Sequence, residues 1–178
     1  MSTTVEIFWG VFWAYWLISA FGAKQGSGAG VRGRPFGILI LIAGAALVRA
    51  LGGRGGPSVS SAPQVAGLVV LGTGLAFAVW ARIHLGRNWG MPMTLKDAPE
   101  LVTSGPYRLI RHPIYSGLLL GLLGTALGAG PVWFIVPAVV ACYFAYCARV
   151  EEGIMASEFP EAYPSYVART KMLIPFVL

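Results

Sequence analysis

Charged residues are scarce in this chain. Of its 178 residues only 11% are Asp, Glu, Lys or Arg, whereas 56% are hydrophobic. A single soluble domain of this length carries roughly twice that share of charge. The low charge therefore excludes an ordinary soluble domain and favours a protein embedded in a lipid bilayer.

Cysteine and histidine are equally rare, with two of each. Cys142 and Cys147 lie five residues apart, about 140° around a helix, so they cannot form a disulfide with each other. We interpret them as packing residues. His84 and His112 match no zinc-binding spacing, so we predict no metal site.

The apolar residues are gathered in blocks of about 16–20 residues, the length of a helix that crosses a bilayer. The blocks are Val5–Ala23, Phe36–Leu51, Gln64–Ala81 and a run from Ile114 to about Cys147, which GAGP (Gly128–Pro131) divides in two. Continuous apolar blocks favour helices over the alternating strands of a membrane barrel. The predicted fold is all-α: a polytopic membrane protein, one integral-membrane domain over residues 1–178, with about five transmembrane helices.

The basic residues predict an orientation. If five spans alternate sides, eleven of the 13 Lys and Arg residues fall on one side, and only Arg49 and Arg54 on the other. Cytoplasmic loops are enriched in basic residues. We therefore expect a multi-pass protein of the cell membrane with its N-terminus outside and its C-terminus cytoplasmic, so that residues 82–113 and 148–178 face the cytosol. The net charge of +6 then reflects this bias and anionic lipid, and no nucleic acid partner is needed.

Glycines form a stripe in the fourth apolar block. Gly117, Gly121, Gly124 and Gly128 fall within about 60° of one another on a helix, and such a stripe lets a second helix approach closely. A second pair, Gly72 and Gly74, allows two interpretations, which are helix packing or contact with a ligand. A Rossmann turn is excluded because no strand precedes the pair and the third small position holds a phenylalanine.

Polar residues are concentrated in Gly105–Gly117, which reads GPYRLIRHPIYSG. Proline disfavours a helical conformation in the residue before it and is favoured at the first position of a helix, so we predict that a helix begins at Pro113. The unpaired N–H groups of this helix start attract anions, and Arg108, Arg111 and His112 lie just before it. The pattern predicts an anion-binding mouth; the alternative is that the arginines contact only lipid phosphates.

Glu151 and Glu152 follow the last apolar run, on the same predicted side as the basic mouth. Acidic residues next to a membrane usually have a partner or a function, although a salt bridge between Arg149 and Glu152 along one helix is an alternative. Aromatic residues at helical spacing around Pro164 predict a short interfacial helix that closes over the site. S-adenosylmethionine, with a carboxylate, a sulfonium cation, hydroxyls and an adenine, fits this mixture better than a nicotinamide dinucleotide does.

Three stretches resemble the isoprenylcysteine carboxyl methyltransferase family and its wider membrane relatives, which include phospholipid N-methyltransferases. They read LGRNW (85–89), ELVTSGPYRLIRHPIYSG (100–117) and RVEEGIMASEFPEAYPSYVARTKMLIPF (149–176). The first two apolar blocks resemble nothing specific, and our hypothesis is that they determine the choice of substrate. The resemblance implies a membrane methyltransferase that binds S-adenosylmethionine in a cytosol-facing pocket and takes a lipophilic or small membrane-partitioning acceptor.

The resemblance also implies residue roles. The cofactor-binding positions are Tyr107, Arg108, Arg111, His112, Pro113, Tyr115, Gly117, Glu151 and Glu152. The predicted catalytic residues are Arg111, His112 and Glu152, where His112 or a glutamate would act as base for an amine or thiol acceptor. Substrate binding is predicted for Asn88, Trp89 and Arg149. Gly72 and Gly74 loosely match a Gly-x-Gly that contributes to cofactor binding in the phospholipid branch.

Two other functions stay open at this point. Membrane sterol reductases use NADPH and carry a similar histidine–tyrosine–glycine pattern, but typically with Gly-Asp where this chain has Gly117-Leu118. A non-catalytic lipid-binding membrane protein is the second. For a methyltransferase, the acceptor could be a prenylcysteine-like carboxylate, a phospholipid amine or a thiol. The sequence does not predict an oligomeric state.

Overall fold

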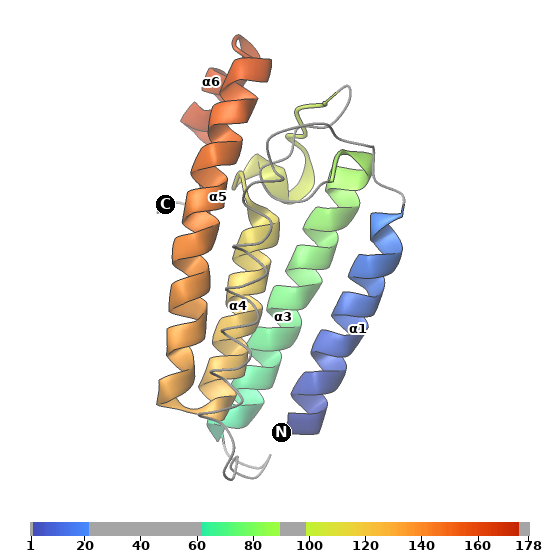
Figure 1. Cartoon of the computed structure of the whole chain (residues 1–178), viewed down its shortest axis with the longest axis vertical. Helices are drawn as coiled ribbons and strands as arrows, with labels where there is room; N and C mark the ends of the chain where they lie inside the picture. Colours follow the sequence, from blue (N-terminus) through green and yellow to red (C-terminus); the bar gives the residue numbers. More distant parts are fainter. Residues whose placement is uncertain (1, 22–61, 90–98, 175–178) are drawn as a thin grey trace.

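The computed structural model describes residues 2–21, 62–89 and 99–174 (Figure 1). The regular secondary structure of these residues is helical, apart from one isolated parallel bridge between Ile110 and Lys171. The long helices are α1 (Ser2–Ala20), α3 (Ala62–Leu85), α4 (Pro113–Ala129) and α5 (Ile135–Glu158). The short ones are η2 (Gly86–Asn88), η3 (Gly105–Arg108), η4 (Pro131–Phe134) and α6 (Ala162–Arg169). The all-α prediction is confirmed for these residues.

The helix boundaries follow the local signals of the sequence. The helix α4 begins at Pro113, as predicted, and the last apolar run breaks at Gly130, which has a φ of 116° and precedes Pro131. The helix α3 continues beyond the predicted end of its apolar block, so Arg82 lies on a helix and not in a loop. The expected second span, Phe36–Leu51, lies outside the described residues.

Two described segments, Ala62–Asn88 and Pro131–Glu158, are long and apolar enough to cross a membrane, while α4 is apolar but shorter. The number of spans and the orientation of the chain therefore stay predictions. Figure 1 shows α1, α3, α4 and α5 running lengthwise, with α6 and the segment 99–112 gathered at one end of the molecule.

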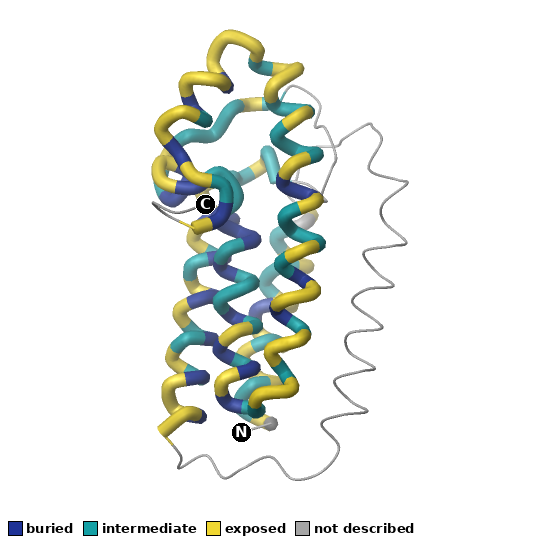
Figure 2. Tube along the Cα trace, turned by 90° about the vertical axis from the view of Figure 1, so that its left-hand side faces the viewer, coloured by how far each residue is buried: buried dark blue, intermediate teal, exposed yellow. Residues whose placement is uncertain are grey.

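Glycines bring α3 and α4 into backbone contact. A Cβ on Gly67 would lie 2.6 Å from the carbonyl oxygen of Gly124, and a Cβ on Gly117 would lie 2.7 Å from that of Gly74. Only glycine permits such an approach. The predicted packing face on α4 is thus confirmed, and Figure 2 shows the buried positions of these helices turned toward their neighbours.

The helix α1 packs on α3 through aromatic side chains. Phe12 is 3% exposed and shares a core cluster with Leu71, Leu75 and Ala78. Trp16, one helical turn further along α1, stacks on Phe12 with ring centroids 5.1 Å apart. A ladder of aromatic rings on α1 therefore leads toward the end of the molecule where α6 and the segment 99–112 lie.

Candidate functional site

The segment before α4 is shaped by its glycine and prolines. Gly105 has a φ of 57°, a conformation that glycine adopts without strain, and it opens the short helix η3 with Pro106 at its second position. His112, held out of the helical region with φ −122° and ψ 59°, precedes Pro113 as expected for a residue before proline. The polar side chains of residues 111 and 112 therefore project from a fixed turn.

The C-terminal tail pairs with this turn through its backbone. The N–H of Arg111 donates to Lys171 O at 2.8 Å, and the N–H of His112 donates to Met172 O at 3.1 Å. In addition, the Tyr166 hydroxyl of α6 donates to Tyr107 O at 2.8 Å. The predicted short helix thus exists and packs on the turn, but the sequence did not predict the strand-like pairing of the two segments.

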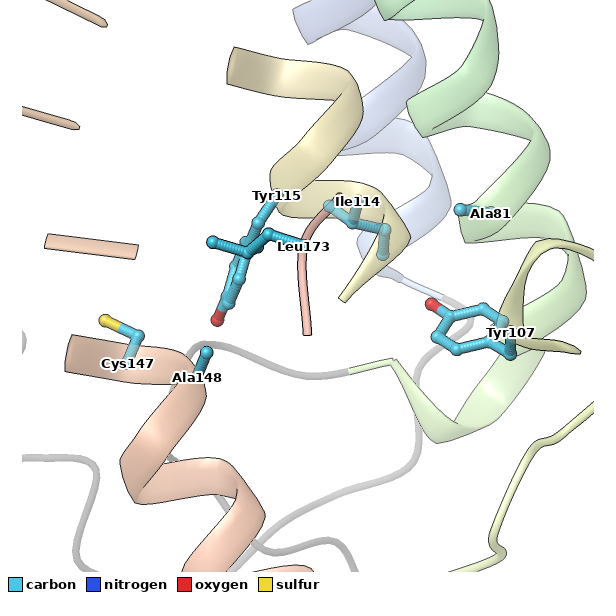
Figure 3. Close-up of a cluster of buried hydrophobic side chains, with 7 residues drawn as sticks. All are labelled: Ala81, Tyr107, Ile114, Tyr115, Cys147, Ala148 and Leu173. Carbon is cyan, nitrogen blue, oxygen red and sulfur yellow. The ribbon is translucent and has the colours of Figure 1, made fainter. Parts of the chain in front are cut away.

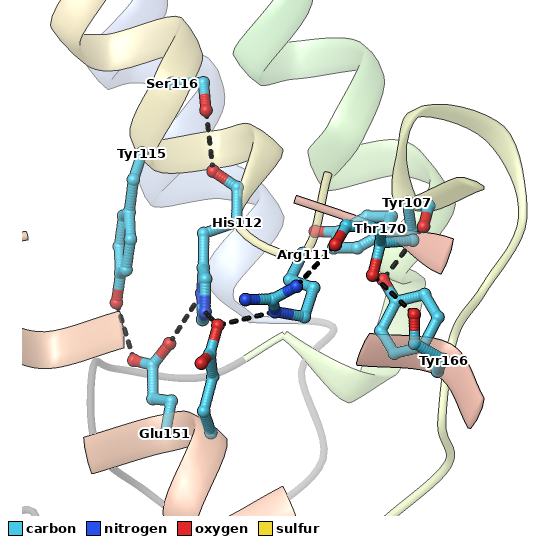
Figure 4. Close-up of polar contacts among 9 residues, drawn as sticks. Tyr107, Arg111, His112, Tyr115, Ser116, Glu151, Tyr166 and Thr170 are labelled. Atoms are coloured by element: carbon cyan, nitrogen blue, oxygen red, sulfur yellow. Dashed lines mark hydrogen bonds and ion pairs between the residues drawn. The ribbon is translucent and has the colours of Figure 1, made fainter. Parts of the chain in front are cut away.

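Side chains from the turn, α4 and α5 meet in one polar cluster, which we define as Arg111, His112, Tyr115, Glu151 and Glu152 (Figure 4). The Nε of Arg111 donates to Glu152 Oε1 at 2.6 Å. The two ring nitrogens of His112 lie 3.3 Å from Glu151 Oε2 and 3.2 Å from Glu152 Oε1. The Tyr115 hydroxyl donates to Glu151 Oε1 at 2.6 Å. Segments separated by about 40 residues therefore form a single network of hydrogen bonds and ion pairs.

The polar cluster is largely withdrawn from solvent. The side chains of Arg111 and His112 are 10% and 11% exposed, and those of Glu151 and Glu152 are 25% and 19% exposed. Burial of charge is tolerated when charges are paired and hydrogen-bonded. In this structure Arg111 and His112 face the two carboxylates, and the binding of an anion at this helix start stays a prediction.

His112 is the titratable centre of the polar cluster. Its burial disfavours the charged imidazolium, but hydrogen bonds with Glu151 and Glu152 outweigh that effect, so the pKa of His112 is raised above its usual value. In α6, burial raises the pKa of Tyr166 to about 12. Its phenol is therefore neutral and available as the donor to Tyr107 O.

Stacked aromatic rings connect the polar cluster to the buried apolar core. The ring of His112 stacks on Tyr115 at 5.5 Å with an interplanar angle of 6°, and Tyr115 stacks on Phe144 at 4.4 Å. A buried core cluster lies beside them, as seen in Figure 3, and comprises Ala81, Tyr107, Ile114, Tyr115, Cys147, Ala148 and Leu173. The polar cluster is thus only partly exposed and borders a packed apolar core.

The remaining predicted cofactor residues differ in their surroundings. Arg108 is exposed at the end of η3, where it remains available to a ligand. Pro113 and Tyr107 are buried packing residues. A Cβ on Gly117 would meet the backbone of Ala78 and Gly74, so helix packing accounts for this glycine, and its cofactor contact stays a prediction.

The Gly72–Gly74 pair is also explained by packing. Gly72 faces the ring of Phe8 on α1, and Gly74 faces the backbone of Gly117 and Gly121 on α4. Both sides of the pair are therefore occupied by other helices. The structure supports the packing interpretation for these two glycines.

The residues assigned to the acceptor lie in two places. Asn88 donates to Glu100 Oε2 at 3.1 Å, and Trp89 packs edge-to-face on Trp16 at 5.6 Å. Arg149 is exposed on α5, one turn before Glu152. Trp89 also packs against the core cluster beside the polar site. The structure brings Trp89 near that cluster but does not test a role in substrate binding.

Arg82 is a residue that sequence reasoning missed. It is 4% exposed and donates to Ser19 O of α1 and to Gly86 O, each at 2.7 Å. Its guanidinium lies 4.7 Å from the ring centroid of Trp89. The sequence predicts Arg82 as the first residue of the cytosol-facing segment 82–113, and a single arginine at the end of an apolar run carries no signal for such burial. It ties α1 to the turn that leads toward the site.

Within the described ranges, no three His, Cys, Asp or Glu side chains are grouped so that they could hold a metal ion.

The comparison that decides the family is a match over residues 63–162 to the family model described as phospholipid methyltransferase.

The chain belongs to the phospholipid methyltransferase family. The matched residues include α4, α5, all of α3 after its first residue, and every member of the polar cluster. The resemblance to membrane methyltransferases that the sequence carries is therefore confirmed. The helix α1 lies outside the matched residues.

Several curated proteins are similar to this chain. Protein-S-isoprenylcysteine O-methyltransferase B of Arabidopsis thaliana is 32% identical over 115 residues, which cover 62% of this chain and 58% of that protein. The cobalt-zinc-cadmium resistance protein CzcN of Cupriavidus metallidurans is 41% identical over 118 residues, 64% of this chain and 50% of that protein. The nickel-cobalt-cadmium resistance protein NccN of Alcaligenes xylosoxydans xylosoxydans is 35% identical over 96 residues, 51% and 44% respectively. The chain spans about half the length of the curated relatives it matches.

Proposed function

We propose that this protein is a membrane methyltransferase that uses S-adenosylmethionine and transfers its methyl group to a lipophilic or small membrane-partitioning acceptor. The observation that carries the proposal is the contact between Arg111, His112 and Glu152, since it unites two polar segments inside the residues matched by the family. When bound, the cofactor supplies a methyl group activated by a sulfonium cation.

The residues of the polar cluster suit such a cofactor. Glu151 and Glu152 offer carboxylates to an ammonium, a sulfonium or ribose hydroxyls. Arg108, which is exposed at the end of η3, is available to a carboxylate. The buried ring of Tyr115 lies beside these groups and already stacks with His112 and Phe144. The cationic and the anionic parts of the cofactor thus each find a matching group.

The protein contributes to the reaction chiefly by positioning the two reactants. Methyl transfer from a sulfonium needs the acceptor atom aligned with the methyl group, and alignment alone can supply several kcal/mol of barrier reduction. The mostly buried polar cluster fixes charged groups in advance and limits water around them. The acceptor class stays a proposal, for which a prenylcysteine-like carboxylate, a phospholipid amine and a thiol are the candidates.

Calorimetric titration of the purified protein with S-adenosylhomocysteine and, separately, with NADPH tests the proposal. We expect binding of S-adenosylhomocysteine and none of NADPH. Arg111→Ala and Glu152→Ala should each weaken that binding by at least about tenfold, because each removes a charged hydrogen bond. Binding of NADPH alone would favour the reductase, which the family match does not favour, and binding of neither would favour a lipid-binding protein.

Matched controls separate a site effect from a general one. Glu158→Ala removes an exposed carboxylate from the last turn of the same helix α5, and Arg87→Ala removes an exposed guanidinium near the end of α3. Both should change the affinity by less than about threefold, since exposed charges contribute little. Thermal unfolding in detergent shows whether each variant is folded, and Arg111→Lys provides a second, milder substitution. If Arg111→Ala and Glu152→Ala both bind S-adenosylhomocysteine with wild-type affinity, the shared cofactor site is wrong, and the basic mouth would contact only lipid headgroups.

A further inference from the structure

Both ring nitrogens of His112 face carboxylate oxygens. Nδ1 lies 3.3 Å from Glu151 Oε2, and Nε2 lies 3.2 Å from Glu152 Oε1. A neutral imidazole has one N–H and one lone pair, whereas an imidazolium has two N–H donors. Against two ionised carboxylates, the neutral ring would turn a lone pair toward one of them. The geometry is therefore that of an imidazolium which donates to both glutamates.

The ring is held in this orientation from several sides. It stacks on Tyr115 with an interplanar angle of 6°, and the N–H of His112 donates to Met172 O at 3.1 Å. Pro113 restricts its backbone. The ring therefore points at α5 because of constraints that do not involve the glutamates.

The two carboxylates are held in turn by other groups. Tyr115, on α4, donates to Glu151 Oε1, and Arg111, on the same turn as His112, donates to Glu152 Oε1. With His112 protonated, two cations balance two anions in the polar cluster. Without that proton, two neighbouring carboxylates would share one arginine, which is unfavourable for groups so little exposed.

We propose that His112 is a positioning residue that works as a bridging imidazolium, which holds Glu151 and Glu152 side by side in the arrangement the cofactor requires. This inference rests on the proposed function. Both N–H groups of the bridge are engaged, so His112 has no lone pair with which to accept a proton from the acceptor. The bridge replaces the base role predicted for His112 from the sequence.

Nitrogen-15 NMR of histidine-labelled protein in detergent tests the bridge directly and needs no cofactor. The chain has two histidines, so His84→Gln leaves His112 as the only signal. At a pH equal to the usual histidine pKa, where a free imidazole is half protonated, we expect both ring nitrogens of His112 to carry a proton in most molecules. A neutral ring with a single protonated nitrogen at that pH would overturn the proposal.

The affinity for S-adenosylhomocysteine tests the positioning role. As the pH rises and His112 loses its proton, the wild-type affinity should fall by about tenfold or more, the loss of a charged hydrogen bond. His112→Gln cannot be charged, so it should bind about tenfold more weakly at low pH and show a flat profile. Equal affinities and parallel profiles would overturn the positioning role, because a purely structural residue would leave the profile unchanged. If the wild type binds no S-adenosylhomocysteine, the proposed function fails, and the NMR result alone decides whether the bridge exists.

Discussion

Substitution of Gly74 by alanine should separate α3 from α4. The added Cβ would overlap the backbone nitrogen of Gly121 and lie 2.7 Å from the carbonyl oxygen of Gly117. Neither atom can rotate away, because both belong to the backbone of α4. Overpacking of a well-packed interior costs about 1–3 kcal/mol, and we expect the upper end of that range here.

Thermal unfolding in detergent, followed by circular dichroism, measures this cost. For a chain of this size, 1 kcal/mol corresponds to about 2–4 °C in Tm, so a loss of about 3 kcal/mol should lower the Tm by roughly 6–12 °C. The site lies at the end of the same helix pair, and affinity for S-adenosylhomocysteine should fall in parallel if the proposed function is correct.

Two other glycines provide controls. A Cβ on Gly72 would meet only the ring of Phe8, at 3.1 Å, and this side chain can move, so Gly72→Ala should cost less than about 1 kcal/mol. Nothing lies within 4 Å of a Cβ on Gly10, and Gly10→Ala should stabilise α1 by about 0.5–1 kcal/mol. A Gly74→Ala protein with the Tm of the wild type would refute the backbone contact of α3 with α4.

Three further predictions concern charge. Arg82→Ala leaves the carbonyls of α1 and η2 without their donor and should lower the free energy of unfolding by on the order of 3 kcal/mol, measured by thermal unfolding; a change below about 0.5 kcal/mol would mean that Arg82 does not tie the two helices. Because the folded pKa of His112 is raised, its contribution to stability is complete below the unfolded pKa of about 6.5 and is lost as the pH rises through the folded value. The Tm difference between wild type and His112→Gln should therefore shrink with rising pH, and a difference that grows would contradict the sign of this shift. For orientation, single cysteines in the Gly52–Pro63 segment of a chain without its native cysteines should react with an impermeant thiol reagent in intact cells, and those near Pro99 only after permeabilisation; the opposite labelling pattern would reverse the predicted topology.

Much of the fold was predictable because its signals act over a few residues. Proline at position 113 starts α4, and the Gly130–Pro131 pair divides α4 from α5. The glycine stripe predicted a close helix neighbour. The sequence could not identify that neighbour as α3, since every apolar helix offers a comparable surface to lipid and to protein.

The candidate site was predictable in its residue types but not in its pairings. The sequence located the basic turn and the two glutamates, and it predicted that they lie on one side of the membrane. It did not predict that Arg111 and His112 pair directly with the glutamates, and the anion-binding mouth itself stays a prediction. With 13 basic and seven acidic residues, charge alone allows many pairings.

The sequence by itself determined that this chain is an apolar helical protein of a membrane methyltransferase family, because hydrophobic runs, prolines, glycines and one long polar motif are local properties. Only the tertiary structure decided which charges meet. The packing of α4 against α5 sets Tyr115 opposite Glu151, and the pairing of the tail with the turn orients His112 toward both glutamates. Arg82 became a buried tie to α1 only because α1 brings the Ser19 carbonyl within 2.7 Å of its guanidinium. Such contacts join residues tens of positions apart, and their energies depend on distances that no local pattern records.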